Sequence, residues 1–100
     1  MDACAEIRPE REMLPNPVSV RNQGAGFDQA REIAYKTANE RLKHPMLLGW
    51  YNDSTGEYSP RVECCSEEKP AWVVYAESRG GAFTVDVNDG AFYFIYMDLG

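Results

Sequence analysis

The sequence has few of the features that mark the larger functional classes. No apolar run reaches about 18 residues, and residues 1–6 lack both a basic and an apolar stretch, so the sequence predicts neither a membrane span nor a signal peptide. Lys and Arg never cluster beyond a scattered pair, which argues against nucleic acid as a partner because phosphate binding needs clustered positive charge. The net charge of −6 is compatible with a basic protein partner and equally with a role in solubility.

Cysteine is scarce, and histidine occurs once. The three cysteines are Cys4, Cys64 and Cys65, an odd number with two adjacent, which favours a reducing cytoplasm over a secreted disulfide framework. The adjacent pair could form a strained vicinal disulfide, act as a thiol pair, or bind a soft metal with Cys4 or His44 as a third ligand. This stays an alternative, because C-x-x-C spacing is absent and His44, just before Pro45, fits a helix cap.

Prolines and glycines divide the chain into an N-terminal arm, residues 1–26, and a single domain, residues 27–100. The arm holds Pro9, Pro15 and Pro17, so regular structure there is limited to a short strand at 18–20. A helix is predicted for residues 27–44, because small or apolar residues recur every three or four positions and a proline follows. These residues are Phe27, Ala30, Ala34, Ala38 and Leu42.

The rest of the chain has a strand pattern. Residues 46–51 and 57–62 flank turn formers and predict a hairpin, followed by a loop at 63–70. Aromatic and β-branched runs at 71–78, 82–87 and 91–97, separated by turn residues at 79–81 and 88–90, predict a meander of three strands. The sequence therefore predicts an α+β fold in which one helix packs on a curved antiparallel sheet of about five strands, in the order arm, helix, strands.

The last predicted strand is apolar on both faces. Alternation places Phe92, Phe94 and Tyr96 on one face and Tyr93, Ile95 and Met97 on the other. One helix cannot cover both sides of a sheet, so the arm, a second copy of the chain or a ligand must cover the second face. We expect a homodimer, because symmetric self-association is the commonest way to bury such a surface.

Aromatic residues concentrate after residue 49 and supply the candidate binding residues. Tyr and Trp are favoured where one end of the side chain is buried and the other meets water, so a subset is expected to line a pocket or an interface on the sheet face. The candidates are Trp50, Tyr51, Tyr93, Tyr96 and Arg79.

Three functions remain open at this stage. The first is a non-catalytic interaction or ligand-binding module that needs no cofactor and whose partner is a second copy, another protein or a small apolar ligand. The second is a thiol- or metal-dependent protein that uses the cysteine pair. The third is a small enzyme with a pocket on the sheet face, which requires Glu77, Arg79, Asp86 or His44 to converge.

Several segments also resemble known families. Residues 28–42, 71–75 and 85–90 resemble small helix-plus-meander families such as the cystatin-like PepSY domains and some bacterial immunity proteins. The stretches at 63–65 and 76–81 are similar to those of a family of short uncharacterised proteins from anaerobic prokaryotes, and that resemblance covers most of residues 27–97. The resemblance implies an α+β fold and no assigned activity.

Overall fold

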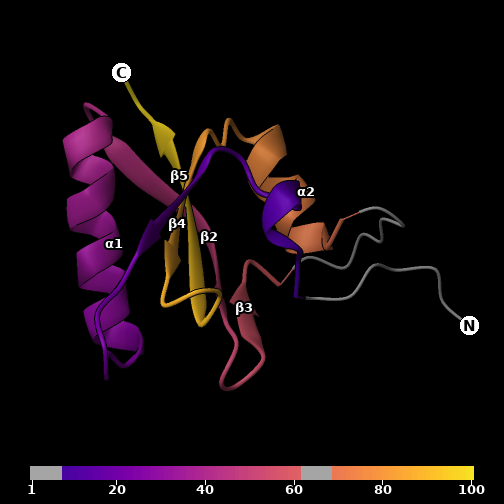
Figure 1. Ribbon diagram of the computed structural model, residues 1–100. Coiled ribbons are helices and arrows are strands. Elements are labelled where there is room, and N and C mark those ends of the chain that lie inside the picture. The colour runs from indigo at the N-terminus through magenta and orange to yellow at the C-terminus, as the bar shows by residue number, and fades with distance from the viewer. Residues whose placement is uncertain (1–7, 62–68) are drawn as a thin grey trace, which may run out of the picture.

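A five-stranded sheet with a helix on each face organises the chain in the computed structural model, which describes residues 8–61 and 69–100 (Figure 1). The strand order is β1-β4-β5-β2-β3, and only the β1–β4 pair is parallel. The predicted α+β class and a sheet of five strands are confirmed, although β1 takes the place of the strand predicted at 71–78. The elements in chain order are the 3-10 helix η1 (Arg11–Met13), β1 (Pro17–Val20), α1 (Phe27–Arg41), β2 (Pro45–Asn52), β3 (Glu57–Ser59), α2 (Ala71–Ser78), β4 (Phe83–Val87) and β5 (Phe92–Asp98).

Helix α1 forms where the periodicity predicts it and packs across β4, β5 and β2. Its fully buried side chains are Ala30, Ala34 and Ala38, and their small size lets the helix lie close to the sheet. The backbone N–H of Gly26, the residue just before the helix, donates to Oε1 of Gln29 at 3.1 Å, which gives this backbone donor a partner at the start of α1. The helix ends at Arg41, three positions before the predicted end.

Residues 71–78 form a helix, so the strand predicted there is wrong. Alanine, valine and aromatic residues in this segment fit either structure locally, and packing decides between them. Trp72, Val73 and Ala76 face the sheet and are buried, whereas Val74 is exposed. The chain leaves α2 sharply: the N–H of Gly81 donates to the carbonyl of Ala76, and a Cβ at Gly81 would lie 2.9 Å from that oxygen.

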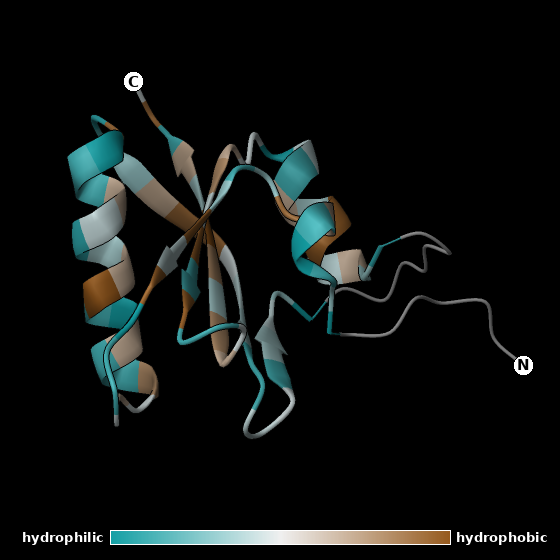
Figure 2. Ribbon diagram, in the orientation of Figure 1, coloured by the Kyte–Doolittle hydropathy of each residue, from teal (hydrophilic) through white to brown (hydrophobic). Residues whose placement is uncertain are grey.

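Helix α2 covers the second face of the sheet, opposite α1. Together with Leu14 it packs over Tyr51, Tyr93 and Ile95, so both faces of β5 are covered within one chain. Figure 2 shows the hydrophobic residues of the strands gathered at the centre of the sheet, between the two helices. An uncovered face was the reason for expecting a homodimer, and this structure removes that reason, so the oligomeric state stays a prediction.

The segment before α1 adds the parallel edge strand. Residues 18–20 form a strand as predicted, and β1 pairs with β4 from Pro17 opposite Thr84 to Val20 opposite Val87. The sheet is therefore mixed instead of wholly antiparallel. The side-chain amide of Asn16 donates to the carbonyl of Ala82 at 2.9 Å, which fixes the start of the strand against the sheet.

The turn predicted at 88–90 joins β4 to β5. Asn88, Asp89 and Gly90 have φ values of 58°, 54° and 90°, the left-handed conformation in which Asx and Gly residues are favoured. The other predicted hairpin turn, at 79–81, instead follows the end of α2.

Candidate functional site

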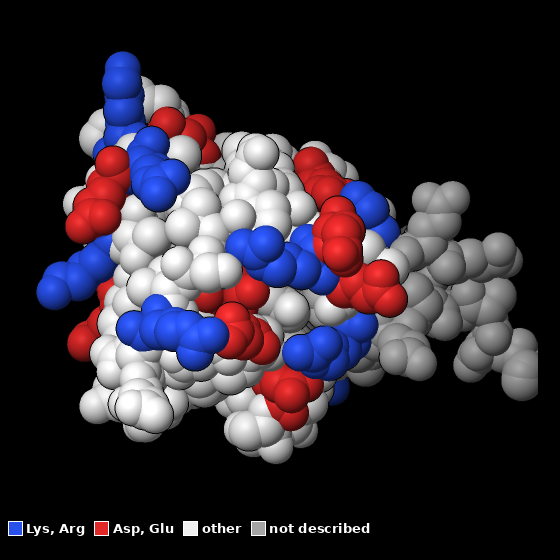
Figure 3. Space-filling model, viewed as in Figure 1, with Lys and Arg blue, Asp and Glu red and all other residues white. Residues whose placement is uncertain are grey.

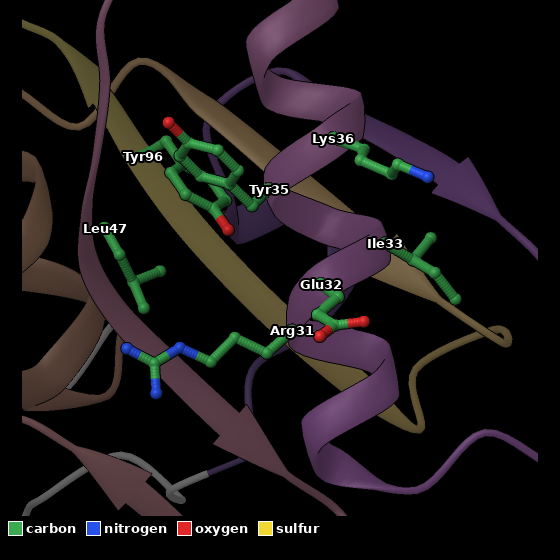
Figure 4. Close-up of a pocket in the computed structure, with 7 residues that line it drawn as sticks. All are labelled: Arg31, Glu32, Ile33, Tyr35, Lys36, Leu47 and Tyr96. Atoms are coloured by element: carbon green, nitrogen blue, oxygen red, sulfur yellow. The ribbon is translucent and has the colours of Figure 1, made fainter.

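A groove lies between α1 and the strands β2 and β5, with a volume of about 580 Å³ (Figure 4). Its floor is formed by Leu47 and Tyr96, which are opposite one another in the β2–β5 ladder. Its wall is formed by Arg31 and Tyr35, one turn apart on α1. This groove is called the α1 groove from here on, and it is lined by Arg31, Glu32, Ile33, Tyr35, Lys36, Leu47 and Tyr96.

The local sequence explains how these side chains meet. Residues 31 and 35 flank the buried alanine stripe of α1, so their side chains extend along the side of the helix that faces β2 (Figure 4). The β2–β5 register shifts between Leu47 and Gly49, which leaves Leu48 as an extra residue packed on the second sheet face. Leu47 and Trp50 therefore both face α1.

The hydroxyl of Tyr96 is the most buried polar group of the α1 groove. The Tyr96 side chain is 1% exposed, and burial raises the pKa of its hydroxyl well above the ordinary value, while the positive charge of Arg31 acts in the opposite direction. The hydroxyl is therefore neutral near pH 7 and available as a donor. Tyr35, across the groove, is 51% exposed.

The predicted candidates Tyr51 and Tyr93 lie on the opposite face of the sheet. The Tyr51 ring stacks with those of Trp72 and Tyr93, at centroid distances of 6.2 and 6.4 Å. Its hydroxyl donates to Oδ1 of Asp53 at 3.0 Å, and the same oxygen accepts from Nε of Arg8 at 2.9 Å. Burial raises the pKa of both tyrosines. The polar groups of Tyr51, Asp53 and Arg8 satisfy one another, which indicates a structural cluster.

Asp86 is the buried carboxylate of the same face. Its Oδ2 accepts from Nε of Arg11 at 3.1 Å, and its Oδ1 accepts from the N–H of Gly90 at 2.6 Å. Arg11 thus fixes η1 to the sheet. Basic and acidic side chains are also interspersed on the surface, as the visible face in Figure 3 shows.

The residues proposed for a small enzyme engage separate partners. Glu77 accepts from Nζ of Lys69 at 2.9 Å, and the Arg79 guanidinium lies 4.7 Å from the centroid of the Tyr75 ring. His44 lies three residues after the end of α1 and just before β2, and its backbone N–H donates to the carboxylate of Asp98 in β5. Asp86 is held by Arg11, so this set forms no common pocket.

Cys4, Cys64 and Cys65 lie outside the described residues, and the thiol or metal alternative is therefore still a prediction. Within residues 8–61 and 69–100, no group of three His, Cys, Asp or Glu side chains is placed to hold a metal ion. No helix in those ranges is both long and apolar enough to cross a membrane.

Sequence reasoning found one of the seven residues that line the groove and missed the other six. Tyr96 was a candidate, and Trp50 lies nearby on the same face, with its ring centroid 4.6 Å from that of Phe27. Arg31, Tyr35 and Leu47 were missed because they come from two elements whose relative placement is tertiary. The one local signal was a tyrosine beside the alanine stripe of a helix whose other exposed residues are polar or charged.

These features define a three-layer α+β domain with an open groove beneath one helix. The chain belongs to the family described as a domain of unknown function (DUF5619), whose model matches residues 15–96 and so spans every residue of the α1 groove. This confirms the predicted membership of an uncharacterised family.

The fold is also present in a solved structure. The crystal structure of AF1514 from Archeoglobus fulgidus DSM 4304 is similar, with 27% sequence identity, a TM-score of 0.72, and coverage of 87% of this chain and 98% of that one. No curated protein matches the chain.

Proposed function

We propose that this domain is a small non-catalytic module that binds a small, largely apolar ligand in the α1 groove. The observation that supports this most directly is the groove itself. Its volume of about 580 Å³ lies within the range of roughly 300–1,000 Å³ that is usual for ligand sites. The Leu47 side chain and the tyrosine rings supply apolar surface, and a few polar groups can orient a bound ligand. This is the usual composition of small-molecule sites.

The chemistry of the lining favours binding over catalysis. Among the described residues that line the groove there is no histidine, cysteine or serine, and the one carboxylate is Glu32. Nucleophilic catalysis needs a nucleophile and a base in hydrogen-bond reach of one another. A neutral tyrosine and an arginine bind and orient a ligand without these groups.

The exposed apolar residues favour a small ligand over a large protein surface. Among the described residues, the large exposed hydrophobic side chains are Tyr35, Met46, Val74 and Leu99, and they come from four different segments. Only Tyr35 lines the groove. A protein interface normally needs a contiguous apolar centre, whereas a small ligand needs only the groove.

Filling the groove tests the proposal. In Leu47→Trp a larger side chain occupies the floor, and binding of the neutral fluorescent probe N-phenyl-1-naphthylamine should weaken at least about tenfold, since little of the probe could then be buried. The matched control is Met46→Trp, because Met46 is 46% exposed and neighbouring strand residues point to opposite faces.

The fluorescence titration is read together with far-UV circular dichroism. If Leu47→Trp does not fold, Tyr35→Ala replaces it, since the half-exposed Tyr35 is removed without opening the core. Tyr35→Ala should weaken probe binding several-fold. A Leu47→Trp or Tyr35→Ala variant that folds and binds as tightly as the unaltered chain would refute the groove as the ligand site.

A further inference from the structure

Arg31 differs from the other described arginines in lacking a partner. Arg8, Arg11 and Arg21 form ion pairs with aspartates. Each of three more lies over an aromatic ring: Arg41, Arg61 and Arg79. Within the described part of the chain, Arg31 makes no ion pair, hydrogen bond or ring contact.

The Tyr96 hydroxyl is the second unpartnered group of the α1 groove. It makes no hydrogen bond to a described residue, although its side chain is 1% exposed. Among the described side chains, the one polar atom that is both fully buried and unpartnered is Oγ1 of Thr84. The Tyr96 hydroxyl is thus open to the groove, where it can donate to a ligand.

The remaining charges of the groove leave Arg31 dominant on the inner side. Glu32 and Lys36 carry opposite charges four residues apart on α1, so they offset one another. Figure 4 shows their side chains extending from the helix away from Leu47, whereas the Arg31 side chain extends toward it. The inner side of the groove therefore has one cation, Arg31, and the hydroxyl groups of Tyr35 and Tyr96.

From this geometry we infer that the ligand is an apolar monocarboxylate. Its carboxylate pairs with Arg31 and accepts from the Tyr96 hydroxyl, and its apolar body lies against Leu47 and the tyrosine rings. A guanidinium matches a carboxylate through two parallel N–H donors. One free arginine suits a single negative charge. This inference rests on the proposed function, because it names the ligand class of the same groove.

The test compares two probes of the same shape. Naphthalene-2-acetate carries the carboxylate, and naphthalene-2-acetamide is its neutral counterpart. Isothermal titration calorimetry at pH 7 and low salt should give about tenfold tighter binding of the carboxylate, as expected of a charge-assisted hydrogen bond at a partly exposed site. Arg31→Gln should abolish this preference and leave the affinity for the amide within about twofold.

The matched control is Lys43→Gln, which removes one positive charge at an exposed position outside the groove lining. It should keep the carboxylate preference. Equal binding of both probes, unaffected by Arg31→Gln but abolished by Leu47→Trp, would overturn the ligand class and leave the groove as a ligand site. Failure of both probes to bind, or binding unaffected by Leu47→Trp, would overturn the proposed function as well. A preference that survives Arg31→Gln would also overturn the role of Arg31.

Discussion

Replacing Val73 by alanine tests whether α2 covers the second sheet face, and the adjacent Val74 provides the control. Val73 is 0% exposed, and Val74 is 39% exposed. Both substitutions remove the same two methyl groups from the same helix and change its intrinsic propensity equally. Any difference between them therefore reports burial alone.

The magnitude follows from the cost of removing buried carbon. Removing three side-chain carbons in a Leu→Ala core substitution costs about 2–5 kcal/mol, so two carbons should cost roughly 1.5–3 kcal/mol. Alanine regains up to about 0.5 kcal/mol of helix propensity. We expect Val73→Ala to lower the free energy of unfolding by about 2 kcal/mol. Val74→Ala should leave it unchanged or raise it by a few tenths of a kcal/mol.

The assay is urea unfolding followed by circular dichroism, with m values compared between variants. The sign for Val74→Ala separates helix from strand, because valine is favoured over alanine in a strand and the substitution would then destabilise the protein. A Val74→Ala loss equal to that of Val73→Ala, or a Val73→Ala loss below about 0.5 kcal/mol, would refute the placement of α2.

Two further predictions concern charged groups. Arg11→Gln leaves the carboxylate of Asp86, which is 3% exposed, without its ion pair, and urea unfolding should show a loss of about 1–3 kcal/mol in the free energy of unfolding. The control Arg21→Gln breaks a pair whose side chains are 76% and 62% exposed, and it should cost under about 1 kcal/mol. Equal costs of the two substitutions would contradict a stabilising role for the pair of Arg11 and Asp86. Backbone N–H donors, that of His44 foremost, hold the pKa of Asp98 below the ordinary value of 3.8 for an aspartate. Its stabilising effect is thus present above the unfolded pKa and lost as pH falls through the folded value. An NMR titration midpoint of the Asp98 carboxyl group at or above 3.8 would contradict a stabilising effect of these hydrogen bonds.

Local patterns predicted the elements whose signals lie within one segment. Helix α1 follows from the spacing of its alanines and the proline after it, and the 88–90 turn follows from its Asx and Gly residues. Helix α2 did not follow, because residues 71–78 have valine and aromatic neighbours that suit a strand locally. The packing of Trp72 and Val73 on the sheet outweighs that preference.

The site was predictable only in part, for a related reason. Tyr96 was predictable because the apolar residues on both faces of its own strand mark that strand in the sequence. Arg31 and Tyr35 look like ordinary residues of a helix surface until α1 is placed against β2. The ion pairs of Arg8 and Arg11 join residues 45 and 75 positions apart, and no local pattern specifies such a pairing.

By itself the sequence determined the α+β class, the position of the main helix and the apolar character of both faces of the last strand, because periodicity and turn chemistry act over a few neighbouring residues. Only the tertiary structure decided what covers the second face, that the first strand runs parallel to β4, and that Arg31 stands beside Leu47 and Tyr96 in a groove. Those outcomes depend on which distant surfaces fit together, a property of three-dimensional packing and not of any one segment.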